Sequence, residues 1–257
     1  MDCLIFRDIL NAILSIFKWA KLMPKIKYIV NYYFASPINI VVLGASGTGK
    51  SQFTKFFSGD SSKSIHRTRQ VVIRTFTLPN GRRIKYFDLP GHDSYALIRK
   101  DVFEKFIIRN KIKGIINVVS YGYHEFENKE ELKIFKTGTY DVREEYLREN
   151  RNREIQQLDE WTSYNLYNHI SWIITIVNKA DIWHENSDNV MTFYEEGEYA
   201  SKLSKFKDCL SIHTFEYCSI IEPFCNKPMK ITIGESKKDE LQNDFIENIL
   251  QFIKGND

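Results

Sequence analysis

Eight consecutive residues carry the clearest chemical pattern of the chain: Gly44-Ala45-Ser46-Gly47-Thr48-Gly49-Lys50-Ser51. Their types match G-x-x-x-x-G-K-[ST], in which a glycine-rich turn points successive backbone N–H groups at a phosphate and a helix N-terminus adds partial positive charge. We expect the eight residues to surround phosphates, with Ser46 and Thr48 mainly filling the loop. Lys50 would contact the outer phosphates as a cation, and the Ser51 hydroxyl would bind Mg²⁺. A glycine-rich turn without a ligand is the alternative.

A second motif, Asp88-Leu89-Pro90-Gly91-His92, ends a strand predicted over Arg82–Asp88. A phosphate-loop protein needs a carboxylate near Mg²⁺, usually acting through water, and we expect Asp88 to supply it. Gly91 would allow its backbone N–H to approach a terminal phosphate. Taken alone, D-x-x-G is typical of an ordinary turn, but its position at a strand end downstream of the phosphate loop favours the metal-binding role.

A third motif, Asn178-Lys179-Ala180-Asp181, follows the apolar run Ile170–Val177. Guanine presents a ring N–H beside an exocyclic amine, and one carboxylate, Asp181, can accept both hydrogen bonds. Lys179 would pack its stem along the ring, and Asn178 would tie the base-binding loop to the phosphate loop. Adenine lacks this pair of donors, so the motif predicts GTP and GDP as ligands in preference to ATP.

The elements that must position these motifs alternate along the chain. Apolar, β-branched runs predict strands at Ile38–Leu43, Val71–Leu78, Arg82–Asp88, Ile115–Val119, Ile170–Val177 and Thr214–Ile220, the second and third forming a hairpin around Pro79-Asn80-Gly81. Helices are predicted from Gln52, at Ser94–Arg109, from Asp141, at Asp188–Phe206 and from a capping box at Ser236 to about Lys254. This alternation predicts an α/β fold, a doubly wound, mainly parallel sheet covered by helices on both faces.

The stretch 121–160 is rich in charge, with 11 acidic and 7 basic residues, and is predicted to be an insertion. Its first half, Gly122–Tyr140, is polar and aperiodic. From Asp141 the pattern becomes that of a long solvated helix whose inward stripe is Ile155, Leu158 and Trp161. We therefore expect a domain over residues 36–257 that carries this charged insertion.

Residues 1–35 are predicted to form a separate amphipathic helix and connector. The polar positions Arg7, Asp8, Asn11, Ser15, Lys18 and Lys21 fall within an arc of about 140° on a helical wheel. Pro24 is expected to end the helix and Tyr28–Ser36 to form an aromatic connector. The uncharged run Ile9–Phe17 is too short to span a bilayer. The helix of residues 4–23 could dock on the main domain, lie on a membrane surface, or bind a partner or a second copy.

Composition narrows the class of protein. The 257 residues carry a net charge of +3, which is too small to indicate a nucleic-acid partner. Residues 1–35 contain five basic and two acidic residues, so this excess of three accounts for the whole net charge. Four cysteines, Cys3, Cys209, Cys218 and Cys225, lie at no spacing typical of zinc sites. Reduced thiols and the lack of a cleavable secretory signal favour a cytoplasmic protein, peripheral at a membrane if the first helix binds there.

With these motifs in hand, the chain resembles the G domain of the translation-factor and Ras-like class of P-loop GTPases, over about residues 38–254. The resemblance implies a six-stranded doubly wound fold, binding of Mg²⁺ and GTP, hydrolysis, and two switch loops that sense the terminal phosphate. It also implies a Mg²⁺-binding switch threonine, for which Thr68 fits best and Thr75, within a strand, is the competitor. Cys218-Ser219-Ile220 loosely matches the last family motif, so that Ser219 would lie beside the base.

His92 has two interpretations. Asp-Leu-Pro-Gly-His is similar to the motif of translational GTPases, in which the histidine positions the attacking water, and to that of the signal-recognition-particle receptor β subunit. A solvent-facing His92 is the alternative. Two segments, the charged insertion and Pro223–Ile233, are not part of a minimal G domain. The receptor β subunit also begins with a membrane span, whereas this chain has only the amphipathic segment there. No subfamily is therefore assigned. Arg67 and Arg69 flank Thr68, and neither is identified as a catalytic arginine.

The sequence thus predicts a GTP-hydrolysing molecular switch that uses Lys50, Thr68 and His92 in catalysis and Ser51, Thr68 and Asp88 around Mg²⁺. An unidentified effector or activating protein is implied, and dimerisation stays open. A GTP-holding scaffold with negligible turnover is the alternative. An ATP-dependent kinase is disfavoured by the guanine-selective motif.

Overall fold

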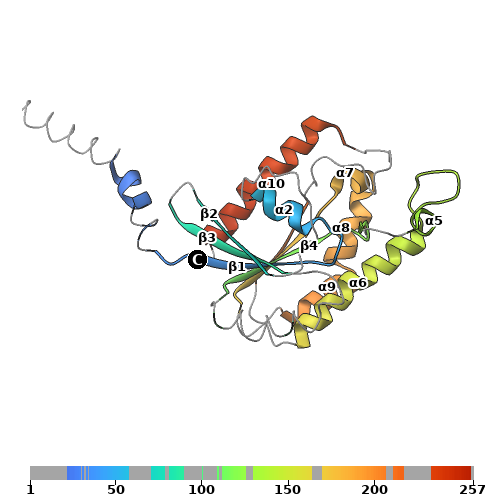
Figure 1. Cartoon of the computed structure of the whole chain (residues 1–257), viewed down its shortest axis with the longest axis horizontal. Helices are drawn as coiled ribbons and strands as arrows, with labels where there is room; N and C mark the ends of the chain where they lie inside the picture. The colour runs from blue at the N-terminus through green and yellow to red at the C-terminus, as the bar shows by residue number, and fades with distance from the viewer. Residues whose placement is uncertain are drawn as a thin grey trace, which may run out of the picture. The chain divides into compact units, whose positions relative to one another are not determined.

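The computed structural model describes residues 22–29, 31, 33, 35–57, 71–78, 81–89, 100, 109, 112–125, 130–163, 170–206, 211–216 and 233–255 (Figure 1). The predictions for Thr68, Gly91, His92 and Ser219 lie outside these residues, as do those for residues 4–21 and nearly all of Ser94–Arg109. The chain divides into two compact units, one of Met1–Ile38 with Thr75–Lys85, the other of Asn39–Arg74 with Tyr86–Asp257.

Six strands form one sheet in the order β2-β3-β1-β4-β5-β6. Their bounds are β1 Ile38–Leu43, β2 Val72–Thr77, β3 Arg83–Asp88, β4 Gly114–Val119, β5 Trp172–Val177 and β6 Ser211–Glu216. The pairs β1–β4, β4–β5 and β5–β6 are parallel, with Val42 opposite Ile116 and Ile116 opposite Ile174. The predicted six-stranded, mainly parallel α/β fold is confirmed.

Two neighbouring interior strands, β4 and β5, are buried along their whole length because helices cover both faces of the sheet. Every residue of β4 (GIINVV) and β5 (WIITIV) is buried, as expected for strands inside a parallel sheet. The helices α2 (Lys50–Phe57) and α10 (Glu235–Gly255) lie on one side of the sheet, and α6 (Glu144–Ser163) and α9 (Glu198–Leu203) on the other (Figure 1). The rings of Phe53 and Phe245 join α2 to α10 edge to face at 5.7 Å. The carboxyl ends of β1, β4 and β5 therefore meet at one edge of a rigid core.

The predicted inward stripe of the charged helix is confirmed, since Ile155, Leu158 and Trp161 are buried in the main core. The helix starts at Glu144 rather than Asp141, because Val142 pairs with Phe135 in an isolated antiparallel bridge. The preceding stretch is also more ordered than its polar sequence indicated. It contains a short helix, α5 (Glu131–Ile134).

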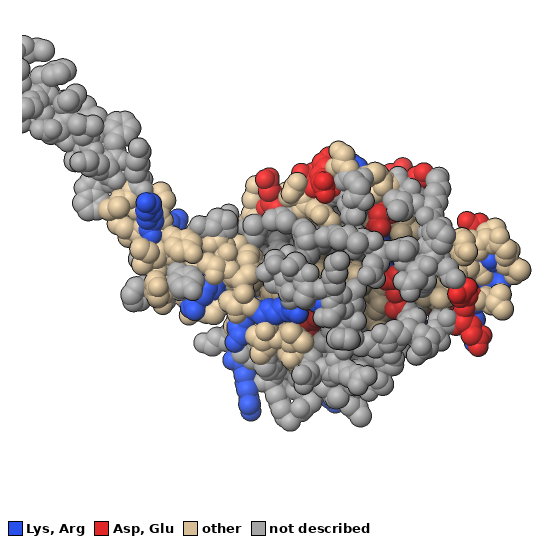
Figure 2. Space-filling model, turned by 45° about the horizontal axis from the view of Figure 1, so that its top comes forward, with Lys and Arg blue, Asp and Glu red and all other residues tan. Residues whose placement is uncertain are grey.

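A small second core holds this insertion together. It is made of the buried side chains Ile134, Phe135, Tyr146 and Leu147. The acidic side chains of Glu130, Glu131, Glu144 and Glu145 face solvent, and acidic residues gather at this end of the larger unit (Figure 2). Residues 130–147 therefore form a packed segment with a charged surface.

Three predicted element bounds are wrong. The helix predicted over Asp188–Phe206 is broken at Gly197 into α8 (Ser187–Glu195), α9 and the 3₁₀ helix η5 (Ser204–Phe206), because the N–H groups of Glu196 and Gly197 both donate to the Thr192 carbonyl. Strand β6 begins at Ser211, three residues before the predicted Thr214. Helix α10 begins at Glu235, so Ser236 lies inside the helix and is not its N-cap.

The smaller unit contains the hairpin turn and the chain that precedes β1. The Leu78 N–H donates to the Arg82 carbonyl at 2.7 Å and the Gly81 N–H to the Leu78 carbonyl at 2.8 Å, which confirms the predicted hairpin. Residues 22–29, 31 and 33 are helical, so the prediction that Pro24 ends the helix is wrong. Of the connector predicted over Tyr28–Ser36, residues 28, 29, 31 and 33 are helical and residues 35–36 are not. Within the described residues, no helix is long and apolar enough to cross a membrane.

Candidate functional site

The glycine-rich loop connects β1 to α2 and is enclosed by two other segments. Gly47 (φ +85°) and Gly49 (φ +88°) adopt left-handed backbone conformations that side chains disfavour. A Cβ on Gly47 would lie 2.3 Å from the Glu125 carbonyl oxygen, and one on Gly49 would lie 2.2 Å from Nδ2 of Asn178. Both glycines are therefore required by backbone conformation and by close approach. Glu125 and Asn178 thus enclose the loop from two sides.

Strand β3 brings Asp88 to the start of α2. The Lys50 ammonium lies 3.5 Å from Oδ1 of Asp88, and the Thr54 hydroxyl donates to Oδ2 at 3.5 Å. The Tyr86 hydroxyl donates to the Thr54 carbonyl at 2.7 Å, which fixes β3 against α2. Burial raises the pKa of the Asp88 carboxyl, and the ammonium of Lys50 opposes that rise. The carboxylate and the cation thus share a nearly water-free position at the N-terminus of α2.

The oxygen donors at this position fit Mg²⁺. A hydroxyl from Ser51 and a carboxylate from Asp88 are hard ligands, and Mg²⁺ in nucleotide sites takes one or two such groups and completes its shell with phosphates and water. Within the described part of the chain no group of three or more His, Cys, Asp and Glu side chains could hold a metal by itself.

The base-binding motif is tied directly to the phosphate loop. The Asn178 amide donates to the Thr48 carbonyl at 2.8 Å, and the Lys179 ammonium donates to the Gly47 carbonyl at 3.2 Å. Lys179 adopts a left-handed conformation (φ +65°) that turns the chain from β5 into α7 (Ala180–Trp183). Asp181 lies in the first turn of α7, half-buried. The carboxyl ends of β1, β3 and β5 therefore converge on the phosphate loop.

The match to known proteins follows this geometry. The family described as 50S ribosome-binding GTPase matches residues 39–179, which is more than half of the chain and includes the phosphate loop, Asp88 and Asn178-Lys179. The chain belongs to this GTPase family. A comparison with curated proteins found no significant match. The phosphate loop is accordingly that of a P-loop GTPase, and guanine nucleotide is its ligand.

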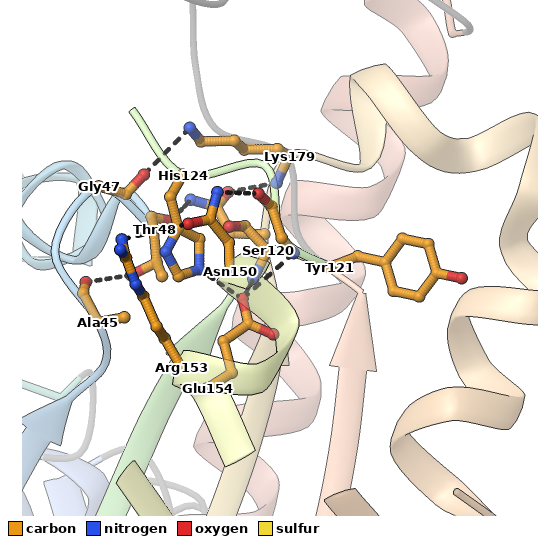
Figure 3. Close-up of polar contacts among 12 residues, drawn as sticks. Ala45, Gly47, Thr48, Ser120, Tyr121, His124, Asn150, Arg153, Glu154 and Lys179 are labelled. Carbon is orange, nitrogen blue, oxygen red and sulfur yellow. Dashed lines mark hydrogen bonds and ion pairs between the residues drawn. The ribbon is translucent and has the colours of Figure 1, made fainter. Parts of the chain in front are cut away.

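One buried carboxylate of this GTPase was missed by sequence reasoning. Oε1 of Glu154, on α6, accepts hydrogen bonds from the backbone N–H groups of Ser120 (3.0 Å) and Gly122 (3.4 Å) and contacts Nε2 of His124 at 2.8 Å (Figure 3). Its other oxygen accepts from the Tyr194 hydroxyl at 2.7 Å. Burial raises the pKa of Tyr194, so the phenol stays protonated and serves as a donor.

A signal for this cluster was present in the sequence. Glu154 and Asn150 continue the spacing of Leu158 and Trp161 toward the start of α6, and both side chains are buried. The Asn150 amide donates to the Gly122 carbonyl at 2.9 Å. Polar residues on an inward helical stripe could have been identified as partners of buried backbone groups.

The same segment contains a buried histidine. His124 is fully buried, and this burial lowers its pKa although the Glu154 carboxylate opposes the shift. A neutral imidazole that donates from Nε2 to Glu154 is consistent with both facts. The segment from Ser120 to Glu125 is thus held by side chains of α6 and reaches the phosphate loop at Gly47.

Proposed function

We propose that the chain is a Mg²⁺-dependent GTP-hydrolysing molecular switch. The observation that carries this proposal is the convergence of Lys50, Asp88 and Asn178 on one preformed loop, with the contacts Lys50–Asp88 at 3.5 Å and Asn178–Thr48 at 2.8 Å. A cation, a metal-binding carboxylate and a base-binding loop are the parts that phosphoryl transfer from GTP requires. Family membership supports GTP binding and hydrolysis in general.

Each residue has a defined task in the proposed reaction. Water forms a bond to the γ-phosphorus while the bond to the β–γ bridging oxygen breaks, so that GDP and phosphate leave. The Lys50 ammonium balances negative charge on the outer phosphates, and backbone N–H groups of the loop hold them in place. Asp88 and Ser51 would hold Mg²⁺, which supplies further charge neutralisation when bound. His92 is proposed from its motif to orient the water, and Thr68 to complete the metal shell.

Single-turnover hydrolysis tests this proposal. The full chain is incubated with substoichiometric γ-labelled GTP, with Mg²⁺ or with EDTA, beside the variant His92→Ala. Phosphate release that depends on Mg²⁺ and falls in the variant is the expected result. Tight GTP binding without release in any condition would instead identify a GTP-holding scaffold.

The N-terminal region is proposed to contact a membrane peripherally. Leu22, Met23, Ile26 and Ile29 are between 38 and 56% exposed, and Lys25 and Lys27 lie on the same helical segment. Apolar side chains next to lysines suit an anionic lipid surface, where each lysine near the lipid adds roughly 1 kcal/mol. The proposal extends to the amphipathic pattern of residues 4–23, which includes Leu22 and Met23.

Liposome flotation separates the alternatives for this region. The full chain should float with anionic vesicles, less so at high salt, and a chain that starts at residue 36 should not float. Flotation of neither form would argue that the segment binds protein, either the main domain, a partner or a second copy.

A further inference from the structure

The segment that follows β4 turns sharply back toward the phosphate loop. Tyr121 (φ +51°) and Gly122 (φ +83°) both have left-handed backbone conformations, and the N–H groups of Tyr123 and His124 donate to the carbonyls of Ser120 and Gly122. The turn ends at Glu125, whose N–H donates to the Gly47 carbonyl at 3.0 Å. The segment therefore reaches the phosphate loop through a main-chain hydrogen bond.

The side chain of Glu125 meets the lysine of the base-binding motif. Its Oε2 lies 3.1 Å from Nζ of Lys179, and that ammonium also donates to the Gly47 carbonyl at 3.2 Å. The Lys179 side chain is 3% exposed and the Glu125 side chain 38% exposed. One ammonium is thus held between a carbonyl of the phosphate loop and a carboxylate of the segment after β4.

Charge and burial explain why this carboxylate matters. An ammonium removed from water must find an opposite charge or several acceptors, because its desolvation is costly. The Gly47 carbonyl is a neutral acceptor, so the full negative charge comes from Glu125. Hydrogen bonds between ionised groups are short and directional, so the pair also fixes where the Lys179 stem lies.

Glu154 gives this arrangement a rigid support. Its carboxylate holds Ser120, Gly122 and His124, and the Tyr146 hydroxyl donates to the His124 carbonyl. Residues of α6 therefore hold both sides of the turn that presents Glu125. A shift of α6 would be transmitted to Lys179 through a short run of hydrogen-bonded backbone.

We propose that Glu125 is a positioning residue for nucleotide binding, which fixes Lys179 against the phosphate loop and links the charged insertion to the base-binding motif. The inference rests on the proposed GTP site and adds a residue to it. Lys179 belongs to the base-binding motif, and GTP and GDP carry the same base, so Glu125 affects GTP and GDP equally. It acts on binding of the nucleotide rather than on the chemical step.

The experiment is a double-mutant cycle on the full chain, read out with a fluorescent GDP analogue and with GTP competition. The variants are Glu125→Gln, Lys179→Met and the combination of both, and Glu125→Asp tests rescue by a conserved charge. Glu130→Gln is the matched control, because Glu130 forms an exposed pair with Lys133 at 3.1 Å in the same insertion. Thermal unfolding of each variant verifies that it is folded.

Glu125→Gln should weaken GDP and GTP binding alike, by roughly three- to thirtyfold, as expected for loss of a coupled charge pair. It should raise KM and leave kcat unchanged. In the Lys179→Met background the same substitution should have no further effect. Glu125→Asp should recover most of the affinity, and Glu130→Gln should bind as the wild type does.

Two outcomes would overturn the inference while leaving the GTP site intact. One is binding by Glu125→Gln that equals or exceeds that of the wild type, which would mean that the carboxylate does not support nucleotide binding. The other is an undiminished loss in the Lys179→Met background, which would indicate a general structural effect. Failure of the wild type itself to bind GTP would overturn the proposed function, and the inference with it.

Discussion

The phosphate loop and the segment after β4 are both irregular stretches at the carboxyl end of a strand, but they are held in different ways. The phosphate loop is fixed largely through its main chain, whose carbonyls at Gly47 and Thr48 accept from Lys179 and Asn178. The segment after β4 is fixed by side chains, above all by the Glu154 carboxylate. The contacts that hold the phosphate loop use its carbonyl groups. The contacts that hold the segment after β4 use its N–H groups, at Ser120 and Gly122.

This difference predicts different consequences of mutation. A residue that contacts only the ligand can be removed while the loop keeps its hydrogen bonds from Asn178 and Lys179. A residue that supports the turn cannot be removed in this way, because several buried donors lose their acceptor at once. Substitutions at the phosphate loop should therefore act mainly on nucleotide affinity, and substitutions at the buried supports of the turn mainly on stability.

The largest effect is expected for Lys50→Ala. The variant removes the cation beside the outer phosphates and should weaken binding of a fluorescent GDP analogue by about a hundredfold or more, as loss of a buried charge contact implies. Its melting temperature is measured alongside, because the substitution also removes the buried ion pair of Asp88. Lys205→Ala, at an exposed pair with Asp159, serves as the control and should bind normally. Equal binding by Lys50→Ala would contradict the assignment of the phosphate loop.

Glu154→Gln should act mainly on stability. The glutamine amide brings an N–H₂ group to a position where the carboxylate now accepts hydrogen bonds from several donors. The free energy of unfolding should therefore fall by about 2–3 kcal/mol in urea denaturation. Glu149→Gln, exposed on the same helix, should change stability by less than about 0.5 kcal/mol. A stability loss of similar size in both variants would show that the buried carboxylate has no special role.

The base-binding motif gives a smaller and more selective effect. Asp181→Asn exchanges a double acceptor for a group with one acceptor and one donor pair, which suits xanthine better than guanine. Affinity for GTP should fall by roughly tenfold or more, as expected when a charge-assisted contact is replaced by an unpaired donor. Competition between GTP and xanthosine triphosphate measures the change. An unaltered preference for GTP would remove Asp181 from base recognition.

The two regions also differ in how far their sequences reveal them. The phosphate and base motifs are contiguous, and the strands that carry them are apolar runs, so β1, β4 and β5 could be predicted to within two residues. Glu154 and Ser120 are distant in sequence and meet only because α6 packs beside β4. The break at Gly197 depends likewise on hydrogen bonds to Thr192 that no periodicity shows. Sequence motifs and periodicity predict the structure of a single segment. The buried polar network depends instead on contacts between residues that are distant in the sequence.

The smallest effect is a dependence of stability on pH that originates at His124. Burial lowers the pKa of His124 in the folded protein, so between that value and the usual pKa of about 6.5 only the unfolded chain takes up the proton. The free energy of unfolding should therefore fall as pH drops below about 6.5. The groups that act on the imidazole are the Glu154 carboxylate, which opposes the lowering, and the cations Lys179 and Arg153, which add to it. Burial raises the pKa of Asp88, and this raised pKa makes stability change in the opposite direction at lower pH, so the comparison must be between variants.

Urea denaturation of His124→Gln at pH 7.5 and 5.5 should show a smaller loss on acidification than the wild type. His184→Gln, at a half-buried position, should keep the wild-type loss. If His124→Gln keeps the full acid dependence, another titrating group is responsible, and a neutral His124 does not support the turn.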